Sequence, residues 1–147
     1  MDFSSPAHKE FYDKVSGWLK ELFGEFVTAR PDAPAFSINV GSAVVQMGAF
    51  EWSQGNVMLS TFAFVVSGAE TTLDLTKYLL KENLTLSLGA YCLNDAGDII
   101  FKHNLPAETC DKAQVNRSVR AVIWTADNYD DEITKRFGGQ RATDRRS

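Results

Sequence analysis

Histidine and cysteine are scarce in this sequence, which contains two of each among its 147 residues. A zinc site needs three or four His, Cys or carboxylate ligands, usually at short spacings. No such spacing connects His8, His103, Cys92 and Cys110. We therefore expect no metal site and no cofactor. Two cysteines in unrelated contexts also differ from the framework of a secreted disulfide protein, which favours a reduced, cytoplasmic setting.

Motifs of known catalytic centres are missing as well. The sequence has no G-x-S-x-G elbow, no phosphate-binding P-loop and no G-x-G-x-x-G fingerprint. Cys110 opens a predicted helix, where a thiol pKa can fall, but the neighbouring Glu108 and Asp111 oppose that effect. We therefore expect no catalytic residues, and the protein is predicted not to be an enzyme.

Long apolar runs are also lacking, since none approaches the roughly 18 residues that a membrane span requires. The first residues, Met1 to Pro6, have neither the basic start nor the apolar run of a secretory signal. Hydrophobic residues make up 44% and charged residues 23%, a balance typical of a folded domain. We predict a single domain over residues 1–137, with no membrane contact.

The net charge of −4 is unevenly distributed along the chain. Five basic residues and one acidic residue lie between Lys135 and the C-terminus, so the rest of the chain is strongly acidic. An acidic body repels the phosphate backbone, which argues against nucleic acid as a partner. Residues 138–147 lack large apolar side chains, and we expect them to form a flexible basic tail.

The spacing of apolar residues predicts the element order α-β-β-β-α-β-β-α. A first helix begins at Ser5 and Pro6 and ends near Gly24, and a last helix runs from a cap at Thr109 to about Arg136. The other elements are strands at 35–40, 43–52, 57–66, 84–93 and 99–105 and a short helix ending near residue 82. Short connectors favour antiparallel hairpins, so the predicted fold class is α+β, an antiparallel sheet with helices packed on it.

Two local patterns within this order are specific. The segment Asn94–Asp98 contains only turn formers and small residues, and Gly97 can supply the positive φ of a tight hairpin. The short helix is expected to bury Leu75, Leu79 and Leu80 on one side.

Both faces of the central strands are apolar, which is the most informative feature of the sequence. One face of the strand from residue 57 carries Val57, Leu59, Ala63 and Val65, and the other carries Met58, Phe62, Phe64 and Val66. The preceding strand likewise divides into Val45, Met47 and Ala49 against Val44, Phe50 and Trp52. A strand with one solvated face alternates with polar residues. Either the three helices cover both faces, or a second subunit or a client peptide covers one of them.

Trp124 adds a similar indication on the last helix, because it lies about 140° from Val119 around the helix axis. It either contacts a partner or lies flat on its own domain. Aromatic side chains dominate binding at protein interfaces. The predicted partner-binding residues are therefore Phe50, Trp52, Met58, Phe62, Phe64 and Trp124.

Carboxylates cluster on the same helix at Asp127, Asp130, Asp131 and Glu132. Paired acids can bind cations or perform acid–base chemistry, and residues 127 and 131 share one helical face. The cluster can also be a solvated acidic patch, and we favour that interpretation.

The strand–turn–strand–helix block resembles a known family. The block comprises Leu84–Leu93, the turn at 94–98, the strand at 99–105, and a helix ending in Trp124–Asp130. It is similar to YbjN-like proteins, described as bacterial sensory transduction regulators, and through them to type III secretion chaperones. The closing Arg136-Phe137-Gly138-Gly139 is similar to cyanobacterial members. The resemblance covers roughly residues 7–139, and it implies a cytoplasmic, non-enzymatic binding protein that is often a dimer.

These observations predict a protein- or peptide-binding module, chaperone-like or regulatory, that binds through an apolar sheet face and the adjoining helix. A homodimer is the expected assembly. The alternative is a small-ligand sensor with a pocket between the sheet and the helices, which would show a closed apolar cavity with a few converging polar groups.

Overall fold

The structure, a computed structural model, describes residues 1–142. Its helices are α1 (Pro6–Phe23), α2 (Leu73–Thr85) and α3 (Lys112–Phe137), with 3-10 turns η1 (Gly24–Phe26) and η2 (Ala107–Thr109). Its strands are β1 (Val27–Ala29), β2 (Ala35–Val40), β3 (Ala43–Ser53), β4 (Asn56–Ser67), β5 (Ala90–Leu93), β6 (Ile99–Pro106) and β7 (Gln140–Arg141). The predicted α+β class and element order are confirmed, and β1 and β7 are short additions to them.

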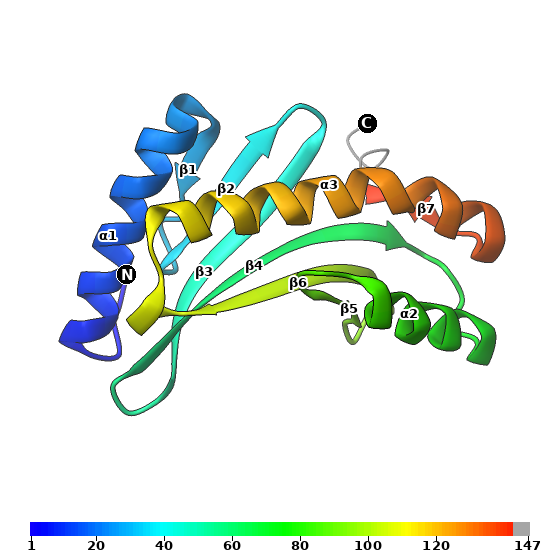
Figure 1. Cartoon of the computed structure of the whole chain (residues 1–147), viewed down its shortest axis with the longest axis horizontal. Helices are drawn as coiled ribbons and strands as arrows, with labels where there is room; N and C mark the ends of the chain where they lie inside the picture. Colours follow the sequence, from blue (N-terminus) through cyan, green and yellow to red (C-terminus); the bar gives the residue numbers. More distant parts are fainter. Residues whose placement is uncertain (143–147) are drawn as a thin grey trace.

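The strands form one antiparallel sheet in the order β1-β2-β3-β4-β6-β5, with β7 paired to β4 outside this path (Figure 1). β3 and β4 are the longest strands and form the centre. The β5–β6 hairpin turns as predicted, since the Asn94 N–H donates to the Asp98 carbonyl and Gly97 has a φ of +80°.

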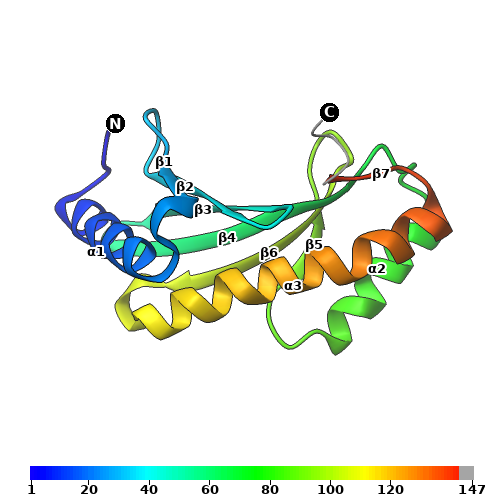
Figure 2. The same ribbon diagram turned by 90° about the horizontal axis from the view of Figure 1, so that it is seen from above.

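All three helices lie on the same side of the sheet (Figure 2). α3 crosses β3, β4 and β6, α1 packs beside it, and α2 lies next to the far end of α3. The side chains of the sheet that point toward these helices are buried, among them Val45, Met47, Leu59, Ala63 and Phe101. The core is therefore a single layer between one face of the sheet and the helices.

Each helix begins at a polar cap. Ser5 Oγ accepts from the His8 backbone N–H, and Thr72 and Asp111 cap α2 and α3 in the same way. His8, in the first turn of α1, is buried, and its Nε2 lies 2.8 Å from the Ala49 carbonyl oxygen. This contact fixes the start of α1 on β3.

Two element boundaries and the burial of one residue differ from the sequence prediction. The expected strand at 84–93 is reduced to β5, because α2 continues to Thr85 and Gly89 then turns the chain with a φ of +79°. Leu80, expected on the buried side of α2, is 69% exposed. The last helix begins at Lys112, because Asp111 caps it and Thr109 belongs to η2.

A register shift in β4 overturns a further expectation. Val66 was predicted on the same face as Phe62 and Phe64, but it is fully buried. The β4–β6 register shifts between Phe64 and Val66, which turns Val66 to the helix side of the sheet.

The segment expected to be a flexible tail from residue 138 includes an ordered strand. Gln140 and Arg141 form β7 and pair with Ser67 and Val66 of β4. Gly139 lies close against the β4 backbone, since a Cβ there would come within 2.7 Å of the Ser67 carbonyl oxygen. Residues 143–147 of the predicted tail lie outside the described residues.

Candidate functional site

The face of the sheet turned away from the helices has no described helix over it (Figure 2). We call it the open face. Phe64 is 37% and Phe50 is 40% exposed there, and Met58 and Phe62 are half-buried. Register places Val44 and Ile100 on the same side as these residues. The apolar part of the open face therefore consists of Val44, Phe50, Met58, Phe62, Phe64 and Ile100.

An aromatic pair forms the middle of the open face. The rings of Phe62 and Phe64 meet edge to face with their centroids 6.3 Å apart. Cross-strand neighbours of Phe62 are Gln46 on β3 and Lys102 on β6, so polar groups flank the pair. Ser60, two residues before Phe62, is buried, and its hydroxyl has no hydrogen-bond partner within residues 1–142.

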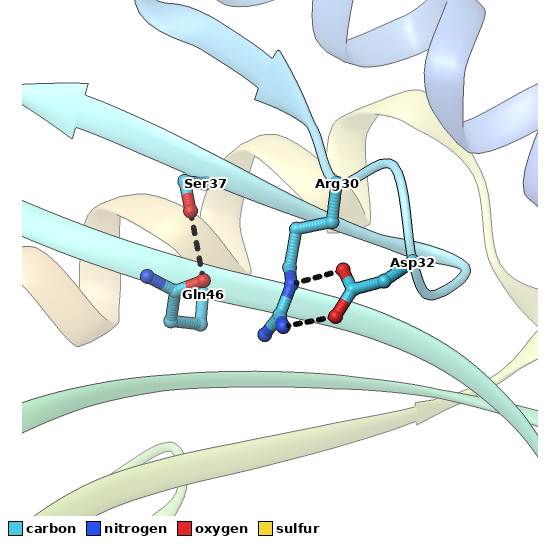
Figure 3. A network of polar contacts seen from close by, with 4 residues as sticks. All are labelled: Arg30, Asp32, Ser37 and Gln46. Atoms are coloured by element: carbon cyan, nitrogen blue, oxygen red, sulfur yellow. Dashed lines mark hydrogen bonds and ion pairs between the residues drawn. The ribbon is translucent and has the colours of Figure 1, made fainter.

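The β2 side of the open face is polar. Figure 3 looks onto this face with the helices behind the strands: Ser37 Oγ donates to Gln46 Oε1 at 2.9 Å. Arg30 donates to both carboxylate oxygens of Asp32, at 3.2 and 2.9 Å. This bidentate pair holds the pKa of the Asp32 carboxyl below its usual value. The open face thus has an apolar half over β4 and a polar half over β2.

Trp52 lies at the end of the open face, next to the β3–β4 hairpin, and is 64% exposed. It lines a groove of about 600 Å³ between this hairpin, α1 and η2. Met58, which belongs to the open face, also lines this groove. Glu10 and Lys14 of α1 supply charges on its opposite wall.

Trp124 belongs to a separate surface on the helix layer. It is 59% exposed and meets Tyr129 edge to face, with 6.1 Å between ring centroids. Together they line a groove of about 400 Å³ with residues 85–88, which connect α2 to β5. The structure therefore brings Phe50, Met58, Phe62 and Phe64 together, places Trp52 beside them, and leaves Trp124 on the other side of the sheet.

The sequence analysis missed an exposed apolar stripe on α2. Leu73, Leu80 and Leu84 are 68%, 69% and 87% exposed. Their spacing of seven and four residues places them on one face of the helix, opposite the buried Leu75 and Leu79. The spacing of Leu73, Leu80 and Leu84 is readable in the sequence and is the signal that predicts this stripe.

Two groups with the side chains of nucleophiles, Ser118 and Cys110, lie in surroundings that limit their reactivity. Ser118 Oγ lies 2.8 Å from His103 Nδ1 and 2.9 Å from Thr61 Oγ1, but Ser118 and Thr61 are both fully buried between α3 and the sheet. Burial raises the pKa of the Cys110 thiol to about 11, so this cysteine is a poor nucleophile. Within residues 1–142 no three His, Cys, Asp or Glu side chains are placed to hold a metal ion. None of the helices in this range is long and apolar enough to cross a membrane.

Residues 9–145 match the family described as T3SS (YopN, CesT) and YbjN peptide-binding chaperone 1. The chain belongs to this family. The sequence-based resemblance to YbjN-like proteins and type III secretion chaperones is thereby confirmed, whereas the cyanobacterial likeness stays a prediction. As a member of this peptide-binding chaperone family, the chain is a chaperone-like protein- or peptide-binding module. No curated protein matches it.

Solved structures of chaperones share the fold. One chain of the HopA1–SchA chaperone–effector complex superimposes with a TM-score of 0.64 and 10% sequence identity, covering 89% of this chain and 98% of that one. A chain from the complex of the Yersinia pestis type III secretion chaperone SycH with a stable YscM2 fragment gives a TM-score of 0.58 and 13% identity. It covers 80% of the present chain and 97% of its own length. The fold is thus chaperone-like, as predicted.

Proposed function

We propose that this chaperone-like module binds an extended segment of a partner protein on the open face of its sheet. The observation that carries the proposal is the absence of any described helix over a sheet face whose centre is the Phe62–Phe64 pair. Aromatic side chains in such a position supply most of the binding energy at interfaces.

The groove beside Trp52 extends this binding surface. Met58 belongs both to the open face and to the groove, so one peptide can follow the surface from Phe64 to Trp52. The polar half of the open face, with Gln46 and Lys102 next to Phe62, offers side-chain donors and acceptors along the same path. Trp124 is a candidate for a second contact, on the helix side.

The proposal includes a homodimer in the cytoplasm and no catalytic step. The apolar stripe of α2 is the surface we assign to the second copy, because it is exposed and separate from the open face. Free thiols at Cys92 and Cys110 agree with a reducing compartment. The burial of Ser118 and the high pKa of Cys110 support the expectation that neither residue acts as a nucleophile.

A small-ligand sensor is less well supported. The space between the sheet and α3 is a cleft of about 170 Å³. Pockets for small organic ligands are usually about 300–1,000 Å³ and enclose most of the ligand. The grooves beside Trp52 and Trp124 are larger, but both lie at the surface.

A displayed library of 12-residue peptides, selected against the purified protein, tests the proposed surface. A selected peptide should bind the Phe62→Ser/Phe64→Ser variant at least about tenfold more weakly, which corresponds to about 1.4 kcal/mol. Phe26→Ser is the matched control, because Phe26 is 53% exposed on η1. Trp52→Ser and Trp124→Ser separate the two grooves. Equal binding by the Phe62→Ser/Phe64→Ser variant and the control, or a library that yields no peptide, would contradict the proposal.

A further inference from the structure

β3 and β4 separate at one end of the sheet. Their pairing ends at Gln46 and Phe62, and beyond this point β3 stays paired with β2 only. β4 continues along β6 and then pairs with β7. Figure 1 shows the two strands diverging, with α3 crossing the opening between them. The sheet therefore has a split that leads from the open face to α3.

A pocket of about 170 Å³ fills this split. Val44 and Phe64 form its rim, and both also belong to the open face. Ala63 and Ala126 add apolar wall, and the exposed Asp127 and the buried Asp130 of α3 also line the pocket. At ~30 Å³ per water, the volume holds about five or six water molecules, enough for the end of one long side chain.

Asp130 is the unusual member of this pocket, because it is a carboxylate with only 6% of its surface exposed. Within residues 1–142, no hydrogen bond or ion pair joins its carboxylate to another side chain, and Thr134 donates to its backbone oxygen instead. The Arg141 guanidinium binds Asp131, at 2.8 Å. Burial raises the pKa of Asp130, and a hydrogen bond from the Asp131 backbone together with the positive charge of Arg141 offsets this only in part. A buried carboxylate without such a partner costs stability.

We propose that this pocket binds the cationic end of an arginine or lysine side chain from a peptide lying on the open face. The proposal rests on the function proposed above and adds a charge preference to it. The apolar rim fits the aliphatic stem of such a side chain, and the two carboxylates fit its charged head. The occupant is cationic because Asp127, Asp130 and Asp131 outnumber the one nearby guanidinium, that of Arg141.

The pocket is tested directly with N-acetyl-arginine methylamide, using N-acetyl-citrulline methylamide as its uncharged isostere. The carboxyl ¹³C signals of Asp127 and Asp130 are followed by NMR while each probe is added at millimolar concentration to the full-length protein. The arginine probe should shift both signals saturably and lower the pKa of Asp130, whereas the citrulline probe should not. Equal effects of the two probes, or no shift with either, would overturn the proposal.

Two variants connect the effect to the pocket. Asp130→Asn and Asp127→Asn should each weaken binding of the arginine probe about tenfold or more. Asp95→Asn, in the exposed β5–β6 turn, makes the same charge change and should leave binding unaltered. Asp127 is exposed, so its replacement tests the pocket even where Asp130→Asn alters packing. Variants at Asp127 and Asp130 that bind like the Asp95→Asn control would refute the assignment.

Thermal unfolding distinguishes a binding role for Asp130 from a structural one. A buried carboxylate without a side-chain partner destabilises the free protein, so Asp130→Asn should raise the Tm relative to Asp95→Asn. A lower Tm would mean that the folded chain itself uses the carboxylate, which contradicts the proposal.

The two proposals can be told apart by their tests. If the arginine probe does not bind, peptide binding on the open face is still supported by the library selection. Failure of the peptide library leaves the probe titration standing, so the two proposals fail separately.

Discussion

His103 Nδ1 of β6 lies 2.8 Å from Ser118 Oγ of α3, and this pair connects the sheet to its longest helix. Ser118 in turn donates to Thr61 Oγ1 of β4 at 2.9 Å. The three side chains form a polar line through an otherwise apolar layer. Because β4 and β6 both pack against α3, the line fixes the position of the helix over the sheet.

Stability should fall on acidification because of His103. Burial lowers the pKa of its imidazole below the usual 6.5, so the unfolded chain takes up a proton near pH 6.5 that the folded chain does not. The free energy of unfolding should therefore decrease from pH 7 to pH 5, and His103→Gln should show a shallower decrease. Urea unfolding at pH 5, 6 and 7 measures both. An identical pH dependence in the variant would show that His103 does not contribute.

Gly89 should be intolerant of a side chain. Its φ is +79°, and a Cβ there would lie 2.6 Å from the Lys102 carbonyl oxygen and 2.9 Å from the Phe101 ring. Gly55 has nearly the same φ, +77°, with nothing within 4 Å. Gly55→Ala should cost about 1 kcal/mol from backbone strain alone, and Gly89→Ala about 2–4 kcal/mol. Chemical denaturation compares the two, and equal losses would mean that the backbone relieves the close contact at no cost.

The boundary between α2 and β5 shows where prediction from the sequence was limited. Alternating apolar residues at 84–88 resemble the start of a strand, but α2 extends to Thr85 and the pairing with β6 begins only at Ala90. The side chain of Asn83 bonds both backbone groups of Tyr91, and this tertiary contact sets the boundary. Local periodicity contains no information about such a contact.

The sequence predicted the aromatic residues of the open face, but not where this face ends. Period-two alternation identified Phe62 and Phe64 as one face, and the structure places them together. Val66 departs from this pattern because a register shift reverses its direction, and the shift depends on pairing with β6. The split pocket was also hidden, because it arises where β3 and β4 separate and residues 82 positions apart, Val44 and Ala126, line one space.

Tyr91→Phe should leave stability unchanged or raise it. The Tyr91 ring packs edge to face against Phe101 and Tyr129, while its hydroxyl is buried without a hydrogen-bond partner within residues 1–142. Burial also raises the pKa of this hydroxyl well above its usual value. Phenylalanine keeps the packing and removes the unpaired group, so we expect a gain of up to about 1 kcal/mol in urea unfolding. A loss of more than about 1 kcal/mol would indicate a buried partner for the hydroxyl.

The exposed stripe of α2 should determine the assembly state. Leu80 and Leu84 are 69% and 87% exposed, and a two-fold axis beside α2 would pair each stripe with its copy. Light scattering should give twice the chain mass of 16.3 kDa for the unmodified protein. Leu80→Glu/Leu84→Glu should give 16.3 kDa, because four carboxylates would meet in an apolar contact. Phe26→Glu on η1 is the control and should remain dimeric. A monomer at micromolar concentration in the unmodified protein would contradict the dimer, and a dimeric Leu80→Glu/Leu84→Glu variant would move the contact to another surface.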